Sequence, residues 1–407
     1  MSQVFSPEPA TSQPRLSAVI RSEGGGGRNF GRFYVVHMLG SVFPLTAGAI
    51  LYGWRAMAVL MMALASTLFF TLVWQRIGRR GGSLHLPHAI WLAILMTMML
   101  PPHLLVGRDI KDLLAGGTTW MIVPAACLLL VLMLWLTGGV GFSRVHPLLL
   151  TQLTLVLFFY PYFHPHLVLH RTRMLTGDLA NVIHNDRITE SIRAEPWIAS
   201  RDEPPTDAIY IPRVASQQLI DYTQLRHGTN SGWISVEGLV RDAMPPLEDL
   251  VVGGHPGPIG ASSAIAVIIG GLFLLYRGLI DYRIPLVAVI ITFAAFLLLP
   301  VPAAIHETGA QWRPLVLARV DLATIVTFAN YELMASPLLL MLFFLATSPS
   351  ICPMGRKAKV VFAIALGLLT AAFQLYLSTS FGPYVALLLA GLLSPWLDET
   401  FRTRPLI

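Results

Sequence analysis

Long apolar runs recur along the chain and leave few folds open to it. A helix needs roughly 20 apolar residues to cross the hydrocarbon core of a bilayer, which is about 30 Å thick. Runs that long, or close to it, cover residues 33–51, 54–74, 90–105, 120–136, 145–163, 259–279, 284–299, 315–335, 360–377 and 384–397. Only 12% of the 407 residues are charged, too few to cover a soluble protein of this length. We therefore expect an all-α polytopic membrane protein with about ten transmembrane helices.

One further apolar run, residues 338–347, is too short to span and ends at Ser348-Pro349-Ser350. Broken helices are tolerated at membrane depth where protein buries the freed backbone groups or a polar cavity receives them. We expect this run to pair with its neighbour as a discontinuous span whose free backbone groups could bind a buried polar ligand. The alternative is a kink whose polar groups are satisfied by the protein itself.

The distribution of basic residues predicts the orientation of the helices. With the N-terminus inside, the short outer loops keep only Arg55, Arg108, Lys111 and Arg313. The inner segments carry many more: Arg28, Arg32, Arg76, Arg79, Arg80, Arg144, Arg277, Arg283, Arg356, Lys357, Lys359, Arg402 and Arg404. The positive-inside rule then places both termini in the cytoplasm.

This orientation divides the chain into five parts. Residues 1–32 lack the apolar region of a signal peptide and are interpreted as a disordered cytoplasmic tail. Two transmembrane repeats, 33–163 and 257–400, flank a segment rich in Asp and Glu, 164–256, which becomes a large extracytoplasmic insert. Residues 401–407 form a second cytoplasmic tail.

Five spans in each half, an odd number, would give the halves opposite orientations. Residues 95–102 and 341–349 are similar apolar stretches ending at proline, and residues 51–55 and 280–283 correspond in position. Two inverted five-helix repeats are therefore predicted. Such repeats place breaks from both halves near the midplane of the membrane, where substrates or cofactors bind.

Four ordered motifs then carry a family resemblance. They are GGVGFSRVHP at 138–147, GPIGASS at 257–263 with YRIP at 282–285, FFLATSP at 343–349, and the closing stretch from Gly382 to Asp398. They resemble G-G-L-G-x-N-x-F-N-P-A, P-G-S-I-G-E-T-S with W-R-I-P, F-F-M-A-T-D-P and G-x-x-F-A-x-L-L-x-N-x-x-x-P-x-x-D of the RnfD/NqrB membrane subunits. Those subunits belong to ion-translocating NADH:quinone and ferredoxin:NAD oxidoreductases.

The resemblance implies a ten-helix inverted repeat, a role in electron transfer and a bound flavin, FMN or riboflavin, near the membrane midplane. It also implies a bacterial inner-membrane location, with other membrane and extracytoplasmic subunits of a redox complex as partners. The motif positions that would line the flavin site are Gly139, Gly141, Phe142, His146, Gly260, Ser262, Thr347 and Ser348. A glycine-rich break can bring backbone N–H groups to a ligand, but small residues also permit close helix packing.

The chain departs from the family pattern at three functional positions. Family members carry covalent FMN on the Thr of an S-G-A-T-P-L motif, and the nearest string here puts Leu179 at that place. Thr229 also lies near glycine, but its surroundings do not match. Ser348 and Ala261 replace the acidic residues of two other motifs. Any flavin is therefore expected to be non-covalent, and a complete ion pump is disfavoured because intramembrane carboxylates usually serve ion coupling.

Two other functions stay open. A flavin-free scaffolding or assembly subunit on the same fold would explain the missing acceptor and the missing acid. An ion or small-solute transporter would have only Asp321 and Glu332, at the two ends of one span, as coupling carboxylates.

Several other classes find no support in the residues. His164, His166 and His170 could hold a metal or haem, but unliganded histidines are commoner at membrane interfaces, so no metal site is expected. The arginines lie at helix ends rather than in a stripe, which excludes nucleic acid as a partner. No hydrolytic triad, P-loop or CxxC pair occurs, so no catalytic residue is assigned.

Overall fold

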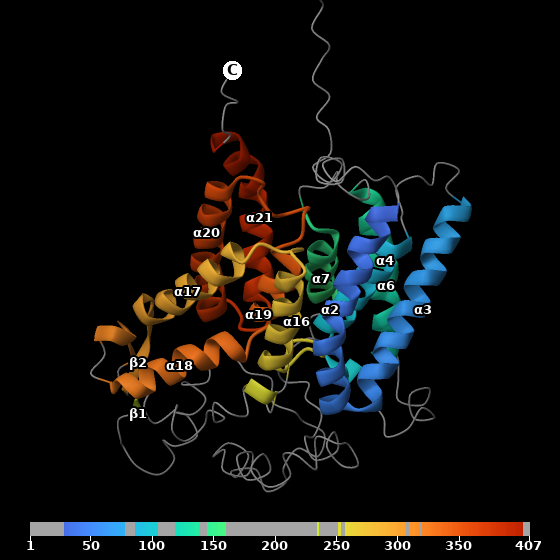
Figure 1. Cartoon of the computed structure of the whole chain (residues 1–407). Helices are drawn as coiled ribbons and strands as arrows, with labels where there is room; N and C mark the ends of the chain where they lie inside the picture. The colour runs from blue at the N-terminus through green and yellow to red at the C-terminus, as the bar shows by residue number, and fades with distance from the viewer. Residues whose placement is uncertain are drawn as a thin grey trace, which may run out of the picture.

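The computed structural model describes residues 28–77, 86–104, 119–137, 145–159, 234–235, 251–253, 257–306, 309–317 and 320–401. The first group of helices comprises α2 (Arg28–Tyr52), α3 (Trp54–Ile77), α4 (Leu86–Met99), α6 (Ile122–Leu136) and α7 (Pro147–Phe158). The second group comprises α16 (Ala264–Tyr276), α17 (Arg283–Leu298), α18 (Leu322–Met334), α19 (Leu338–Leu340), the π-helical turn η4 (Met341–Leu345), α20 (Arg356–Tyr376) and α21 (Gly382–Thr400). Short 3₁₀ turns are η1 (Pro102–Leu104), η2 (Thr119–Met121) and η3 (Leu315–Leu317). Figure 1 shows the two groups side by side.

Three of the described helices are long and apolar enough to cross a membrane, at Phe33–Tyr52, Trp54–Arg76 and Arg356–Tyr376. The bent pair α18 and α19–η4 adds a fourth candidate, and five shorter apolar helices accompany them. Large apolar side chains such as Leu157 and Leu322 point outward, 77% and 74% exposed. A surface of this kind needs lipid rather than water around it, so the described part of the chain is a helical membrane protein.

The helices follow the predicted apolar runs, with two corrections. The run 315–335 is predicted as one span, but α18 begins only at Leu322, after the turn η3. The run 259–279 is predicted to be helical from its start, but residues 257–263 form a turn and α16 begins at Ala264. Both runs are apolar where the backbone is not yet helical, so hydropathy alone could not locate the boundary.

A small antiparallel sheet departs from the all-α prediction. Its strands are β1 (Ile234–Ser235), β2 (Pro300–His306) and β3 (Gly309–Pro314), in the order β1-β2-β3. Val301 faces Arg313 in the hairpin, and Ile234 faces Ile305. β1 belongs to the predicted insert 164–256, so the sheet joins that insert to the loop between α17 and η3.

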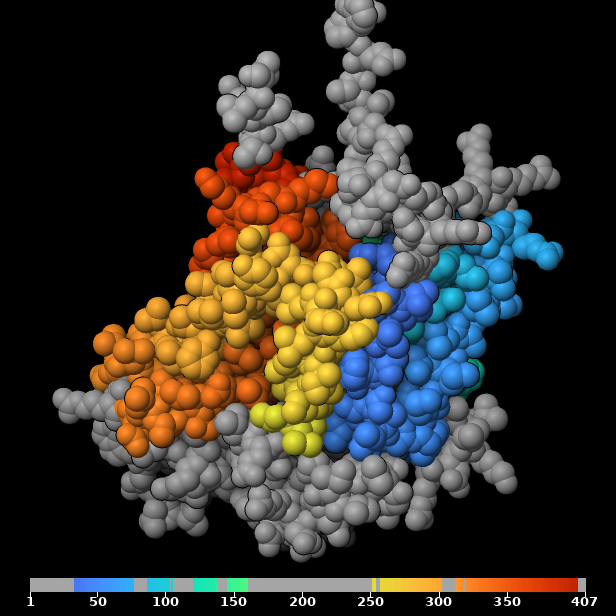
Figure 2. All heavy atoms as spheres, viewed as in Figure 1, coloured from blue at the N-terminus to red at the C-terminus, as the bar shows by residue number. Residues whose placement is uncertain are grey.

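The two helix groups meet where α2 packs against α16. A Cβ on Gly270 would lie 2.6 Å from the carbonyl oxygen of Gly40, and a Cβ on Gly48 would overlap Ile259. Because rising numbers on α2 meet falling numbers on α16, these first helices of the two groups run antiparallel. Glycines let the two backbones approach closely, as small residues do between membrane helices. Figure 2 shows α16, in yellow, filling the space between α2 and α17.

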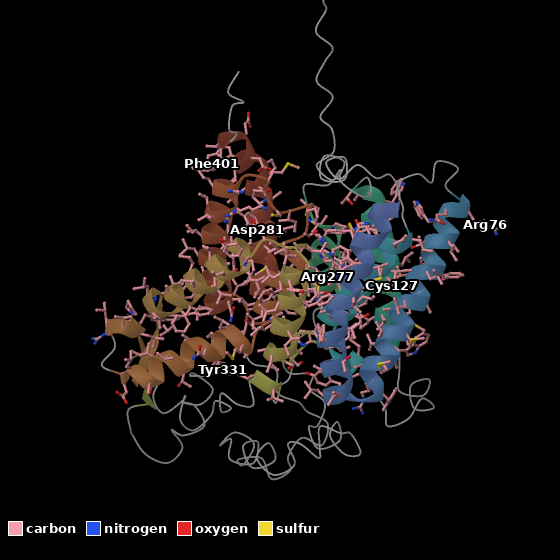
Figure 3. All side chains as sticks on the ribbon, in the orientation of Figure 1. Arg76, Cys127, Arg277, Asp281, Tyr331 and Phe401 are labelled. Atoms are coloured by element: carbon pink, nitrogen blue, oxygen red, sulfur yellow. The ribbon has the colours of Figure 1, made fainter. Side chains whose placement is uncertain are left out.

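Within the second group, α17 and α20 run parallel. Lys359 Nζ lies 3.0 Å from Asp281 Oδ2 at one end, and the Tyr376 hydroxyl donates to the carbonyl oxygen of Pro300, 2.8 Å away, at the other. Figure 3 places Asp281 with Arg76 and Phe401 on one side of the molecule, opposite Tyr331. The end of α20 that carries Tyr376 is therefore the end at which the sheet lies.

Candidate functional site

Five of the eight predicted site residues lie within the described part of the chain. These are His146, Gly260, Ser262, Thr347 and Ser348. Gly139, Gly141 and Phe142 lie outside the described residues, as do most of the insert and the histidines at 164, 166 and 170.

Gly260 lies in the turn before α16, where the backbone pairs with the end of α4. The N–H of Gly260 donates to the carbonyl oxygen of Met98 (2.9 Å), and the N–H of Ile259 donates to that of Leu100 (3.0 Å). A Cβ at position 260 would overlap the Cβ and Cγ of Met98. Glycine is thus needed here for close approach of two protein segments, and it leaves no room for a ligand beside it.

Ser262 is held by a hydroxyl from the first helix group. Its Oγ donates to the carbonyl oxygen of Pro258 (2.8 Å) and pairs with the hydroxyl of Tyr52. The same Tyr52 hydroxyl lies 3.1 Å from the carbonyl oxygen of Gly257 and 3.2 Å from its N–H. The polar groups of this turn are therefore satisfied by the protein.

Thr347 and Ser348 follow η4, at the predicted break in the second group. α18 and α19–η4 bend by 57° at the break between them, which confirms the predicted discontinuity. The N–H groups of Ala346 and Ser348 donate to the carbonyl oxygens of Met341 (2.8 Å) and Leu345 (3.0 Å). Thr347 Oγ1 donates to the carbonyl oxygen of Phe343 (2.7 Å), and Ser348 Oγ pairs with Ser350 Oγ (3.1 Å). These bonds favour the kink alternative over a break that leaves backbone groups free.

His146 caps the start of α7 and lies among buried rings. We call these residues the Trp91 cluster: Tyr34 and His37 of α2, His88 and Trp91 of α4, and His146. The Trp91 ring lies 5.4 Å from Tyr34, 5.6 Å from His37, 6.0 Å from His88 and 6.4 Å from His146 between centroids. Within the described residues, Nδ1 of His146 and Nε1 of Trp91 are both buried without a hydrogen-bond partner. The cluster thus offers two unsatisfied polar atoms between aromatic faces.

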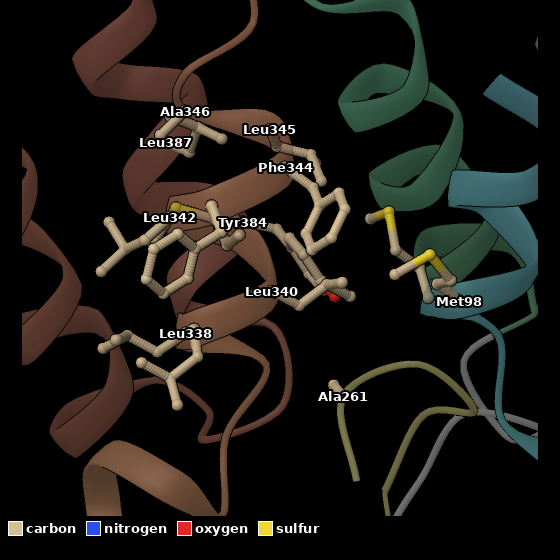
Figure 4. Close-up of a cluster of buried hydrophobic side chains, with 14 of the residues drawn as sticks. Met98, Ala261, Leu338, Leu340, Leu342, Phe344, Leu345, Ala346, Tyr384 and Leu387 are labelled. Atoms are coloured by element: carbon tan, nitrogen blue, oxygen red, sulfur yellow. The ribbon is translucent and has the colours of Figure 1, made fainter. Parts of the chain in front are cut away.

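The structure does not gather the predicted residues into one site. Figure 4 shows Ala261 and Met98 facing one end of the α19–η4 segment, whereas Ala346 follows Leu345 at the other end. Gly260 and Ser262 therefore belong to one neighbourhood and Thr347 and Ser348 to another. His146 belongs to a third, since the ring that it contacts is that of Trp91.

Two groups of polar residues were not predicted as sites. The Trp91 cluster escaped because its members come from separate runs, and only their buried histidines gave a signal. Glu332 is predicted as a carboxylate of one span, but its partner Gln374 is not, because the two lie 42 residues apart. A glutamine within an apolar helix was the available signal.

Interrupted apolar helices, a short outer sheet and a tightly packed seam between two helix groups define a multi-span helical membrane protein. The chain belongs to the NQR2, RnfD, RnfE family, whose sequence profile matches residues 26–406. The predicted resemblance is thereby confirmed.

Two relatives illustrate the match, and both carry the letter D among the components of their complexes. The component of the Na(+)-translocating ferredoxin:NAD(+) oxidoreductase complex of Acetobacterium woodii is 30% identical over 40% of this chain. The component of the ion-translocating oxidoreductase complex of Halorhodospira halophila is 24% identical over 89% of this chain. The alignment spans 43% of the Acetobacterium protein and 87% of the Halorhodospira protein.

Proposed function

We propose that the chain is an RnfD-type membrane subunit of an ion-translocating oxidoreductase complex in a bacterial inner membrane. The observation that carries this proposal is the family match over residues 26–406, with the Halorhodospira relative aligned over most of both chains. Its partners are then the other membrane and extracytoplasmic subunits of such a complex, together with the lipid bilayer. The role of the chain is to pass electrons between partners on the two sides.

The inverted five-helix repeat belongs to the same proposal. The antiparallel packing of α2 against α16 supports it, because the first helices of two inverted repeats must run in opposite directions. With the N-terminus inside, the sheet formed by β1, β2 and β3 lies on the extracytoplasmic side, where the insert is expected.

A flavin held non-covalently fits one of the described neighbourhoods. Gly260, Ser262 and Thr347 use their polar groups and their space on protein contacts, whereas the Trp91 cluster leaves Trp91 Nε1 and His146 Nδ1 free. A flat ring system with polar atoms along its edge suits this combination of aromatic faces and free nitrogens. His146 also follows Gly139, Gly141 and Phe142 closely in sequence, so these candidates remain part of the proposed site.

In this arrangement the chain supplies binding and orientation. Trp91 Nε1–H is a donor that can only be satisfied by an acceptor, and His146 Nδ1 can pair with a donor or an acceptor depending on its tautomer. The rings of Tyr34 and His88 exclude water from the same space. When bound, FMN or riboflavin would supply one- and two-electron chemistry that side chains lack.

A flavin-free scaffolding subunit is the second candidate. It is favoured by the internal satisfaction of the turn at 257–263 and of the break after η4, together with Leu179 and Ser348 at the motif positions of the acceptor and the acid. A transporter on the same fold is a third candidate, and Glu332 is the buried carboxylate that it would use.

The experiment that separates these functions is an absorption spectrum of the detergent-purified protein before and after acid precipitation. Flavin bands that move to the supernatant support a non-covalent electron carrier. Bands that stay with the pellet mean that a covalent acceptor exists in the chain. A well-folded preparation without flavin supports the scaffolding subunit.

The location of the flavin is tested by two variants and a matched control. Trp91→Phe keeps the ring and removes the free N–H, and His146→Ala removes the free Nδ1; each should lower the flavin content several-fold. Tyr384→Phe removes another buried hydroxyl without a partner, on α21, and should leave the content unchanged. Full occupancy in both Trp91→Phe and His146→Ala would exclude the Trp91 cluster.

A further inference from the structure

Glu332 is a fully buried carboxyl on α18, two residues before the helix ends at Met334. Its side chain contacts Gln374 of α20, whose Nε2 donates to Glu332 Oε2 at 3.0 Å and also to the Glu332 backbone carbonyl. Gln374 is buried as completely as Glu332. Two oxygens of this pair, Glu332 Oε1 and Gln374 Oε1, have no hydrogen-bond partner in the described part of the chain.

No basic side chain that the structure describes neutralises this carboxyl. The ionisable residues of α18 and the helices beside it are Asp321, Tyr331, Arg283, Arg356, Lys357, Lys359, Tyr376, Tyr384, Asp398 and Glu399. Lys359 bonds to Asp281 and precedes Gln374 on α20 by 15 residues, or about 22 Å at 1.5 Å per residue. Arg283 lies beside that same aspartate. The Tyr376 hydroxyl donates to Pro300.

A carboxylate in this position would be an unpaired charge at membrane depth, which is costly. One proton removes the charge and also turns Glu332 Oε1 into a donor. Gln374 Oε1 is the acceptor that this donor lacks, and it belongs to the same amide that already holds Oε2. A carboxylic acid and a primary amide form such two-bond rings, in which each group donates once and accepts once.

We propose that Glu332 and Gln374 form an exchangeable proton-binding site within the second helix group. The neutral acid of Glu332 pairs with the amide of Gln374, and loss of the proton breaks one of the two bonds that tie α18 to α20. This inference goes beyond the proposed electron transfer and does not depend on a bound flavin.

The position of the pair gives the proton a defined route and the site a defined consequence. Gln374 precedes the end of α20 by two residues, so the site lies about one turn from the membrane surface where the sheet is placed. Glu332 also lies just before the 57° bend between α18 and α19–η4. A change in its protonation therefore acts on the segment that leads into the bend.

Reaction with dicyclohexylcarbodiimide tests the proposal, because this apolar reagent modifies protonated carboxyl groups in membranes. The full-length protein is treated in detergent at a series of pH values, and the labelled residues are identified by mass spectrometry. We expect Glu332 to be labelled at neutral pH and progressively less at alkaline pH. Glu399, an exposed carboxyl on α21, serves as the internal control and should stay unlabelled at neutral pH.

Two outcomes would overturn the proposal. Absence of labelling at Glu332 in a folded preparation at neutral pH would mean that the carboxyl carries no exchangeable proton. Protection of Glu332 by sodium ions at constant pH and ionic strength would mean that the site binds a metal cation instead.

Infrared spectroscopy provides a second measurement that does not rely on reagent access. Glu332→Gln keeps the shape of the side chain and should remove one carbonyl band of a protonated carboxylic acid. Gln374→Leu keeps the carboxyl but removes the ring partner, so the same band should move to the position of a less strongly bonded acid. An unchanged band in both variants would contradict the pairing, whatever the flavin content of the preparation.

Discussion

At the scale of single residues, the Tyr52 hydroxyl forms a connection between the two helix groups. It comes from the last residue of α2 and contacts Gly257 and Ser262 in the turn before α16, more than 200 residues away in sequence. This turn also pairs with the end of α4 through Gly260. One hydroxyl thus helps to fix where the second helix group begins.

Tyr52→Phe should lower the free energy of unfolding by about 1–3 kcal/mol, because the buried Ser262 hydroxyl and the Gly257 N–H lose a partner. Thermal unfolding in detergent measures the change. Tyr276→Phe is the matched control, since Tyr276 is 88% exposed, and it should alter stability by less than about 0.5 kcal/mol. Equal stability of the two variants would show that the Tyr52 contacts contribute nothing.

Asp281 is a residue outside the spans whose ionisation responds to its surroundings. Partial burial opposes ionisation, but Lys359 Nζ, the backbone N–H of Arg283 and the charges of both side chains outweigh it, so the pKa of Asp281 lies below its ordinary value. A lowered pKa means that the folded chain binds this proton more weakly than the unfolded chain. The pair therefore stabilises the fold at neutral pH, and its contribution is lost as the pH falls through the folded-state pKa.

We expect wild type to lose up to about 1 kcal/mol more stability than Asp281→Asn between neutral and acid pH, in keeping with a partly exposed ion pair. Unfolding curves in detergent across that range provide the measurement. Lys359→Gln should flatten the same pH dependence from the other side of the pair. A dependence that survives in both variants must come from other groups.

At the scale of elements, the seam between α2 and α16 depends on glycine. Gly270 faces the carbonyl oxygen of Gly40 and the ring of Phe344, and no side chain fits in the gap. Ile269, the preceding residue on α16, points outward and is 44% exposed. Neighbouring positions on one helix thus have opposite requirements.

Gly270→Leu should destabilise the protein by about 1–3 kcal/mol or prevent its folding, since added carbons must push the two helices apart. Ile269→Leu, the control on the outward face, should fold like wild type. Yield of monodisperse protein after detergent extraction is measured first, and thermal unfolding follows for whatever folds. A stable Gly270→Leu protein would show that the seam is looser than described.

The sequence predicted helices better than strands, for a physical reason. A membrane helix needs only a long apolar run, which hydropathy detects without any knowledge of neighbours. β2 and β3 contain prolines at 300, 302 and 314 and are paired by residues on either side of a short turn, so their signal lies in the pairing. Likewise Gln374 could not be assigned to Glu332, because their contact exists only once α18 and α20 are packed.

The candidate site was predictable by motif but not by geometry. Gly260 and Ser262 occur where the resemblance put them, yet their role in the structure is to join the turn to α4 and Tyr52. The free polar atoms lie instead in the Trp91 cluster, of which only His146 was named from sequence. A motif marks positions under a common constraint, and close packing is a constraint as much as binding is.

At the scale of the whole molecule, the charged ends of the helices separate from the sheet. Asp281, Arg76 and Phe401 lie on one side, and the chain turns back through β2 and β3 on the other. The positive-inside rule assigns the first side to the cytoplasm. The orientation can be tested directly with cysteine labelling.

In a background of Cys127→Ala and Cys352→Ser, a single cysteine is introduced at Tyr276 or at Trp312, which are 88% and 50% exposed. A membrane-impermeant thiol reagent applied to spheroplasts should label Trp312→Cys at once and Tyr276→Cys only after permeabilisation. The reverse pattern would place both termini outside. The background protein without added cysteine measures unspecific labelling.

The pairing of β1 with β2 gives the predicted insert a fixed point close to its C-terminal end. Ile234 and Ser235 are held opposite Ile305 and Ala304, only 22 residues before Gly257. The insert therefore consists of a long loop closed at β1 and a short tether from β1 to α16. A shortened version of the protein can lose the long loop alone, whereas a cut that also removes Ile234–Ser235 exposes an unpaired strand edge where two molecules can join.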